Sequence, residues 1–165
     1  MSSTFGGSRF VKPVDFRLVR YPAPASTVIS IGDLLYWDAT NSVVKPLSAY
    51  VGSGTAGTDH TDLAALFVGV AVQARLAQQV TAGEIEVVTE CVYEADCASA
   101  STYLPGDMVS VVSSGAAAAG AISDQAVVET ATVSKAIGVV TKYTSGAITK
   151  VTVRLIWLET IIEII

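Results

Sequence analysis

The stretch Ile31-Gly32-Asp33-Leu34-Leu35-Tyr36-Trp37 (IGDLLYW) carries the pattern that decides the fold of this 165-residue chain. A Gly-Asp pair is typical of a turn, and the apolar and aromatic residues after it favour a β-strand. The turn-forming residues 38–42 (DATNS) precede Val43 and Val44, so the strand is predicted to return as a hairpin. The same turn-then-strand pattern comes back at Pro105–Val109 (PGDMV).

Two further blocks of sequence also have a second copy. Phe67–Val72 (FVGVAV) resembles Ala136–Thr141 (AIGVVT), and Gly83–Thr89 (GEIEVVT) resembles Gly146–Thr152 (GAITKVT). The three pairs keep their order along the chain, at offsets of 74, 69 and 63 residues. The alternative is that any β-barrel reuses Gly-Asp turns and Gly-Val strands. On either interpretation the pattern predicts two similar β units that share one core.

The remaining segments complete an all-β prediction. Residues 65–72 form a continuous apolar run, typical of a buried strand, and residues 84–93 alternate between apolar and charged side chains. Further strands are expected at 108–112, 126–133, 136–143 and 147–156, loops at 52–62 and 115–120, and short helices at most at 62–67 and 73–80. The expected fold class is a compact β-barrel or sandwich-like domain.

Both ends of the chain differ from this domain. Tyr21-Pro22-Ala23-Pro24 excludes a regular helix and favours an extended connection, so residues 1–25 are predicted to form an extended N-terminal arm. The β domain is expected at 26–155, followed by an apolar C-terminal tail at 156–165.

The composition indicates apolar surface that something else covers. Apolar residues make up 51% of the chain, charged residues only 15%, and the mean hydropathy is +0.53. Typical domains carry about 25% charged residues. A membrane is not expected to be the cover, because the longest apolar stretches, such as 64–72, fall short of the ~18–20 residues of a spanning helix. No signal-peptide pattern is seen either. We therefore expect an oligomer or a larger protein assembly.

The charge is divided unevenly along the chain. The net charge is −5 overall, with +3 on residues 1–20 and −8 on the rest. Because an acidic body repels phosphate backbones, no nucleic-acid partner is expected. The basic residues of the arm are predicted to meet an acidic protein partner, and the alternative is a solvated terminus.

The last ten residues present a second predicted contact surface. Leu158, Ile161, Ile162 and Ile165 fit a helical stripe, whereas the high isoleucine content favours a strand, so the conformation stays open. Each large apolar side chain left in water would cost about 1.5–3 kcal/mol. We expect a neighbouring subunit to cover this tail.

Patterns for chemistry are weak in this sequence. Residues 52–57 (GSGTAG) match a dinucleotide fingerprint, but no strand-helix-strand context surrounds them and position 77 is alanine, where an acid is needed. His60 is the single histidine, between Asp59 and Asp62, and no nucleophile elbow accompanies it. We expect no catalytic residue, no metal site and no cofactor.

Two other groups of reactive side chains have simple explanations. The carboxylates Glu84, Glu86, Glu90, Glu94 and Asp96 are predicted to form a solvated acidic face that discourages aggregation between strand edges. Cys91 and Cys97 are too few for a disulfide framework and are expected to be buried or half-buried thiols.

Taken together, these blocks resemble the small capsid decoration (cement) proteins of tailed bacteriophages. The resemblance covers about residues 28–155 and rests on Ile31–Asp38, Phe67–Ala71, Gly83–Thr89, Leu104–Asp107, and the pair Ala136–Val140 and Val151–Leu155. It implies a β-barrel-like domain, often a trimer, on the capsid surface. The chain departs from the family pattern at Cys91, where glycine is frequent, and in its arm and tail.

The function implied is that of a structural virion protein and not of an enzyme. It would be made in the host cytoplasm, bind the outer surface of the capsid, and stabilise it by bridging neighbouring major capsid protein subunits, as a homo-oligomer, expected to be a trimer. The predicted contact residues are Arg9, Phe10, Lys12, Phe16, Arg17, Arg20, Tyr21, Trp157, Leu158, Ile161, Ile162 and Ile165. The alternative is a receptor- or carbohydrate-binding β module of a virion appendage.

Overall fold

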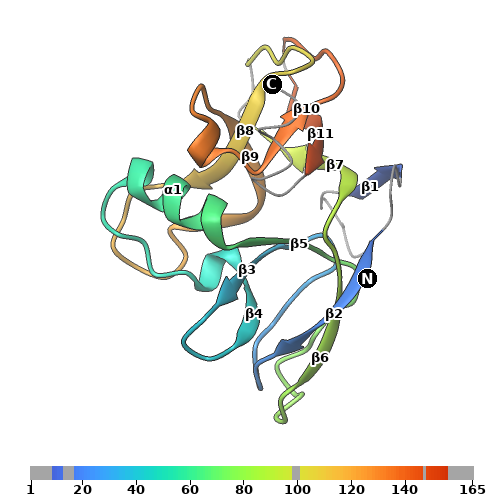
Figure 1. Cartoon of the computed structure of the whole chain (residues 1–165), viewed down its shortest axis with the longest axis vertical. Coiled ribbons are helices and arrows are strands. Elements are labelled where there is room, and N and C mark those ends of the chain that lie inside the picture. The colour runs from blue at the N-terminus through green and yellow to red at the C-terminus, as the bar shows by residue number, and fades with distance from the viewer. Residues whose placement is uncertain (1–8, 13–16, 98–100, 147, 156–165) are drawn as a thin grey trace, which may run out of the picture.

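The computed structural model describes residues 9–12, 17–97, 101–146 and 148–155, which fold into two β-sheets and one α-helix (Figure 1). The N-terminal sheet has the strand order β2-β6-β5-β3-β4, and the C-terminal sheet has the order β1-β7-β11-β10-β8-β9. The N-terminal sheet comprises β2 (Leu18–Ala23), β3 (Leu34–Asp38), β4 (Val43–Pro46), β5 (Phe67–Ala71) and β6 (Gly83–Val88). The C-terminal sheet comprises β1 (Arg9–Lys12), β7 (Cys91–Asp96), β8 (Met108–Ser113), β9 (Ile122–Glu129), β10 (Gly138–Val140) and β11 (Lys150–Leu155). The prediction of a mostly β fold is confirmed.

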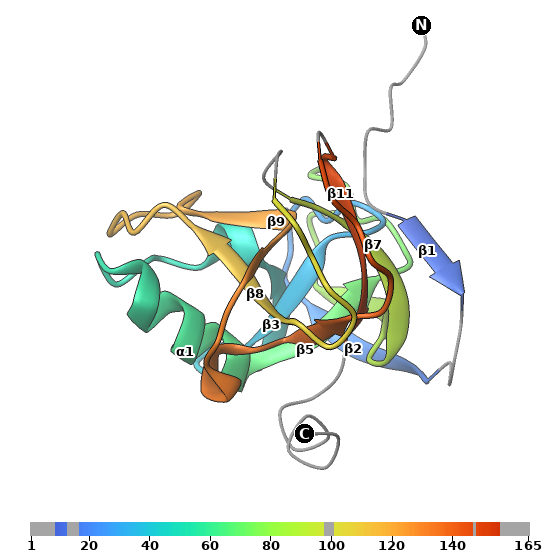
Figure 2. The same ribbon diagram turned by 90° about the horizontal axis from the view of Figure 1, so that it is seen from above.

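The helix was not predicted where it occurs. The helix α1 spans Ala56–Leu66, whereas the sequence analysis expected a loop at 52–62 and at most a short helix at 62–67. The segment 73–80 contains no helix. Two 3-10 turns, η1 (Leu47–Ala49) and η2 (Val133–Lys135), complete the structure. The helix lies at one side of the molecule and β1 at the other (Figures 1 and 2).

The two sheets are copies of one five-stranded unit. Strands β2 to β6 are arranged in the order first-fifth-fourth-second-third, and strands β7 to β11 repeat this order, with β1 added outside β7. Equivalent turns also make equivalent backbone hydrogen bonds. Gly32 donates to Ala71 O at 2.8 Å, and Gly106 donates to Val140 O at 2.9 Å. The duplication inferred from sequence is therefore present in the fold.

The register corrects one of the three predicted offsets. Ala71 pairs with Val87 and Val140 pairs with Val153, so β6 corresponds to β11 with an offset of 66 residues and not 63. The alignment of Gly83 with Gly146 was wrong because the turn before β11 differs in length from the turn before β6. The other offsets, 74 for β3 and β8 and 69 for β5 and β10, agree with the pairing of Leu35 with Gly69 and of Val109 with Gly138.

The duplicated glycines mark a close approach between strands. A Cβ atom on Gly69 would lie 2.2 Å from Val88 O, and one on Gly138 would lie 2.5 Å from Arg154 O. Gly69 also has a φ of +151°, which L side chains rarely adopt. At both points the added Cβ atom would meet backbone atoms of the neighbouring strand, which cannot move aside as a flexible side chain could.

The segment assigned to an arm is partly a strand of the domain. Leu18–Ala23 pairs with β6 over its full length, and Ala23 is fully buried. The expectation of an arm over 1–25 therefore does not hold for these residues. Pro22 was the misleading signal, but a proline fits an edge strand when its nitrogen faces away from the neighbouring strand. Residues 1–8, 13–16 and 156–165 lie outside the described part of the chain.

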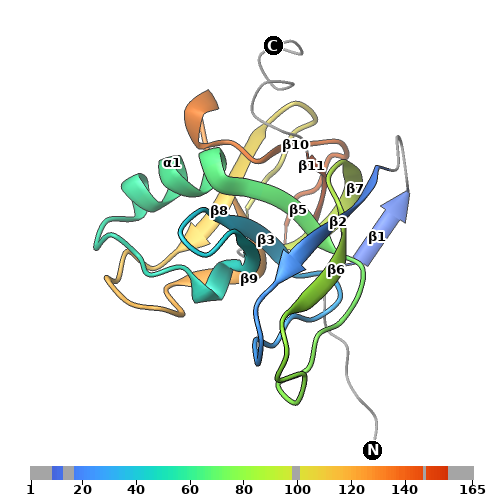
Figure 3. The ribbon, with the colours of Figure 1, turned by 60° about the horizontal axis from the view of Figure 1, so that its bottom comes forward.

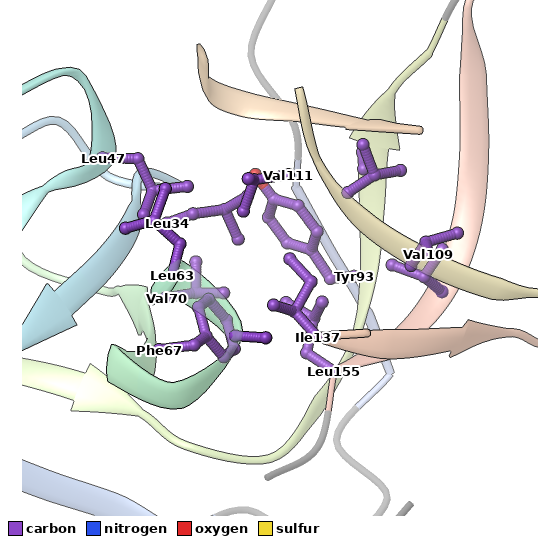
Figure 4. Packing of buried hydrophobic residues seen from close by; sticks show 14 of the residues in the cluster. Leu34, Leu47, Leu63, Phe67, Val70, Tyr93, Val109, Val111, Ile137 and Leu155 are labelled. Carbon is purple, nitrogen blue, oxygen red and sulfur yellow. The ribbon is translucent and has the colours of Figure 1, made fainter. Parts of the chain in front are cut away.

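Both units contribute to one hydrophobic core. The largest cluster joins Leu34, Phe67 and Val70 of the N-terminal sheet to Tyr93, Val109, Val111 and Leu155 of the C-terminal sheet, and it includes Leu63 of α1, which lies beside Leu34 and Val70 (Figure 4). A second cluster, including Leu35, Val44, Ile85 and Val87, occupies the other face of the N-terminal sheet. Tyr93 adds a buried polar link, because its hydroxyl donates to Gly32 O at 2.6 Å.

Replacing either duplicated glycine by alanine is expected to destabilise the fold. Because the added methyl group meets backbone, Gly69→Ala and Gly138→Ala are each expected to lower the free energy of unfolding by about 1–3 kcal/mol in urea titrations. The matched control is Gly57→Ala in α1, whose Cβ meets only Lys135 Nζ at 3.4 Å. The control is expected to be neutral or stabilising by up to about 1 kcal/mol. Equal effects for all three variants would contradict the close approach.

Candidate interaction surfaces

The predicted basic contact residues lie along the first two strands. The backbone of Arg9, Phe10 and Lys12 belongs to β1, which pairs with β7. Arg17 is exposed just before β2. Phe16, Trp157, Leu158, Ile161, Ile162 and Ile165 lie outside the described residues, so their roles remain predictions.

Arg20 and Tyr21 occupy different environments on β2. The Arg20 guanidinium binds Glu86 Oε1 at 3.1 Å, and because its side chain is 67% exposed this ion pair adds little stability. Tyr21 is half-buried, with its ring centroid 6.2 Å from that of Trp37. Arg20 therefore faces solvent, whereas Tyr21 contributes to packing inside the N-terminal sheet.

Tyr21 and Trp37 line an apolar groove that the sequence analysis did not identify. Leu66, Phe67 and Val68 complete its walls, and its volume is about 350 Å³. A second hollow of about 490 Å³ continues from Trp37 past Asp38 and Asn41 towards Tyr50. Asp38 is held by Lys45 Nζ at 2.6 Å, and hydrogen bonds from Lys45 and Asn41 lower the pKa of this carboxyl group to about 2.

The loop before β6 forms one apolar end of the molecule. Ile29 forms a β-bridge with Arg75, and the exposed side chains of Val28 and Leu76 flank it, while Val80 follows at 73% exposure. The buried Arg75 side chain fixes the loop, because its Nε donates to Pro24 O at 2.8 Å and its guanidinium also binds the carbonyl of Thr81. We call Val28, Leu76 and Val80 the first apolar end.

The duplicated unit forms a corresponding second end. Tyr103 forms the equivalent β-bridge with Thr144, with backbone hydrogen bonds of 2.8 and 3.0 Å. The exposed Leu104 and Tyr143 flank this bridge. The loop between β5 and β6 and the loop between β10 and β11 lie at opposite ends of the long axis (Figure 1). We call Leu104 and Tyr143 the second apolar end.

The polar residues next to His60, in the first half of α1, stabilise the fold. Asp59 is buried and accepts hydrogen bonds from Ser113 Oγ at 2.6 Å and from Ser53 N at 2.7 Å. Burial opposes ionisation of Asp59, but these hydrogen bonds keep its pKa below the usual value.

Among the described residues no group of three or more side chains that could hold a metal ion is found. No helix in that part of the chain is long and apolar enough to span a membrane.

The acidic residues on β6 and β7 are partly paired. Glu84 is exposed, Glu86 binds Arg20, and Asp96 binds Lys150 Nζ at 2.6 Å. The other predicted members, Glu90 and Glu94, are half-buried like Glu86 and Asp96, and β6 and β7 belong to different sheets, so the prediction of one solvated acidic face holds only for Glu84.

The two cysteines are free thiols, as expected. Cys91 is buried, and desolvation raises the pKa of its thiol to about 12. Cys97 is half-buried, and burial followed by the nearby Asp96 charge raises its pKa as well. Neither thiol has the lowered pKa of a catalytic nucleophile.

Thiol labelling is expected to separate the two cysteines. At pH 8 an aromatic disulfide reagent is expected to modify Cys97 first, and Cys91 only as fast as the fold opens, because its thiol is both buried and protonated. The Cys97→Ser variant is expected to show no fast phase, and adding denaturant restores the reaction of Cys91. A fast phase in this variant without denaturant would contradict the burial of Cys91.

Comparison with known proteins yields little. No protein family model and no curated protein sequence matches the chain. Among solved structures, the chain is similar to the head fiber gp8.5 N base of bacteriophage phi29, with 14% sequence identity and a TM-score of 0.46. The similarity covers 84% of this chain and 94% of that chain. A TM-score at this level is too low to support a conclusion about function.

Proposed function

We propose that this chain is a structural virion protein that binds the outer surface of a capsid shell and stabilises it. It bridges neighbouring major capsid protein subunits and acts as a homo-oligomer, a trimer in our proposal. It performs no catalysis and needs no cofactor. In this proposal the protein is located on the capsid surface of a bacteriophage.

The observation that carries the proposal is the pair of apolar ends. Duplication of the five-stranded unit gives the molecule equivalent loop pairs at opposite ends of its long axis (Figure 1). Both pairs are pinned by a β-bridge and expose apolar side chains, among them Val80 and Tyr143. A rigid body with an apolar contact at each end can hold two neighbouring subunits of a shell together.

The distribution of charge supports a protein surface as the partner. The body is acidic, whereas residues 1–20 carry a net charge of +3. In our proposal Arg9, Lys12, Arg17 and Arg20 face acidic shell residues, and Phe10, Phe16 and Tyr21 add apolar contacts. Truncation at residue 20 is unsuitable as a test, because it would remove the first half of β2. Several weak contacts per oligomer would add up through avidity.

A charge introduced at either end is expected to weaken shell binding. Val80→Glu and Tyr143→Glu each place a carboxylate in an apolar contact, so each is expected to reduce binding by at least about tenfold, equivalent to about 1.4 kcal/mol. The measurement is co-sedimentation with empty shells of the virus that encodes the chain. The matched control is Val51→Glu, since Val51 is 65% exposed but belongs to neither end.

The double variant Val80→Glu/Tyr143→Glu is expected to lose binding altogether. Circular dichroism confirms that each variant is folded. Binding by the double variant at the strength of the unchanged protein would rule out the apolar ends as the shell contact.

The groove at Trp37 favours a second candidate function, the binding of a carbohydrate receptor. Trp37 packs against Tyr21 and lines a hollow together with Asn41 and Lys45, and an aromatic side chain beside polar ones is a suitable surface for a sugar ring. A glycan array probed with the full chain tests this directly. Binding that is abolished by Trp37→Ala in a folded protein would support it, and an array without any signal would rule it out.

A further inference from the structure

The outer edge of β7 is occupied along most of its length. The backbone of Val92–Glu94 pairs with β1, and Asp96 pairs with Ala126 of β9, which joins the two ends of the C-terminal sheet. Val92 is only 9% exposed. Both contacts depend on backbone groups that point away from β11.

Among the described residues no strand pairs with the corresponding edge of β2, although β4 lies near this strand. Register places Leu18–Arg20 at the positions of Val92–Glu94, and Pro22 at the position of Asp96. Pro22 has no N–H group, and among the described residues β2 pairs with β6 alone. Leu18 is 43% exposed, although its counterpart Val92 is covered. Figure 3 shows β2 and β6 together at the margin of the N-terminal sheet.

The open edge can accept another strand. Thr89 N donates to Arg17 O at 3.2 Å, so Arg17, Val19 and Tyr21 direct their backbone groups towards β6. Leu18, Arg20 and Pro22 alternate with them and direct theirs outwards. Leu18 and Arg20 therefore offer two N–H donors at the positions where β7 receives β1.

A strand that fits this edge should carry the opposite charge to the basic strand β1. On β7 the basic residue Arg9 stands opposite Glu94 in the register, whereas β2 has Arg20 at the equivalent position and Arg17 nearby. Arg17 is exposed, and Arg20 is 67% exposed although it binds Glu86, so an acidic strand complements β2. Residues 156–165 contain five isoleucines, Glu159 and Glu163, and no basic side chain. Isoleucine favours β-strands, so this segment has both the charge and the propensity required.

We propose that residues 156–165 of a second copy of the chain add as a strand to the Leu18–Arg20 edge of β2. The inference rests on the homo-oligomer in the proposed function and names the contact that forms it. The strand β11 ends at Leu155 on the side of β7 away from β1, whereas β2 is the neighbour of β6 at the margin of the other sheet. To reach this margin within its own protomer the tail would have to pass over β6 and β2, whereas the tail of a neighbouring copy can approach it directly.

The oligomeric state of the full chain and of three variants tests this proposal. The full chain is expected to be an oligomer by light scattering, and the chain ending at Leu155 is expected to be a folded monomer. Leu18→Pro removes one outward N–H and is expected to shift the equilibrium at least about tenfold towards monomer. Leu18→Thr keeps that N–H and serves as the matched control. An oligomer that survives both the truncation and Leu18→Pro would overturn the proposal.

Charge reversal supplies a second measurement that a misfolded variant cannot imitate. Arg20→Glu alone and Glu159→Arg/Glu163→Arg alone are each expected to weaken the oligomer, and the triple variant is expected to recover it. Failure of the triple variant to recover, with circular dichroism showing a folded protein, would count against the pairing.

Cross-linking decides whether the strand comes from a second copy. In a Cys97→Ser background, Leu18→Cys combined with Ile161→Cys or Ile162→Cys is expected to give covalent oligomers on oxidation. An internal disulfide within a monomer would overturn the exchange between copies. Shell binding is measured separately. If the unchanged protein binds shells but the tests find no strand contact at β2, this inference fails and the proposed function still stands.

Discussion

The shared hydrophobic core is the constraint on which the rest of this structure depends. Leu34, Phe67 and Val70 point from the N-terminal sheet into the same cluster as Tyr93 and Val109 of the C-terminal sheet. Because both faces of the N-terminal sheet carry buried side chains, this sheet cannot leave its partner without exposing one of them. The hydrogen bond from Tyr93 to Gly32 O lies in this core and fixes how the two units meet. The shared core therefore fixes the position of the two apolar ends and of the sheet edges relative to one another.

The differences between the two units are as informative as their likeness. Three of the differences concern an outer edge, namely Pro22 against Asp96, Leu18 against Val92, and the added strand β1. The duplicated interior is retained, down to the glycines that let β5 and β10 approach their neighbours. The molecule therefore has a duplicated interior and margins that differ between its two units, which agrees with the proposed function.

The sequence predicted much of the interior and little of the margins. The Gly-Asp turns and apolar runs identified β3, β5, β8 and their duplication, because buried strands leave strong local patterns. The helix Ala56–Leu66 was missed since its first half, AGTDH, is polar and contains a glycine, and it is held by the buried Asp59 in a long-range contact with Ser113. The strand β2 was mistaken for an arm because its pairing with β6 is remote in sequence and Pro22 masks it. The groove at Trp37 joins residues of β2, β3, α1 and β5, a combination that no local pattern reveals.

Hydrogen exchange at the open edge of β2 tests the central claim, that other copies of the chain complete this molecule. The measurement compares the outward-pointing amides of Leu18 and Arg20 with those of Val92 and Glu94 in the full chain at a concentration where it is assembled. The account predicts that the amides of Leu18 and Arg20 exchange as slowly as those of Val92 and Glu94, and that they become fast in the chain that ends at Leu155. Fast exchange of the Leu18 and Arg20 amides in the assembled full chain would contradict it.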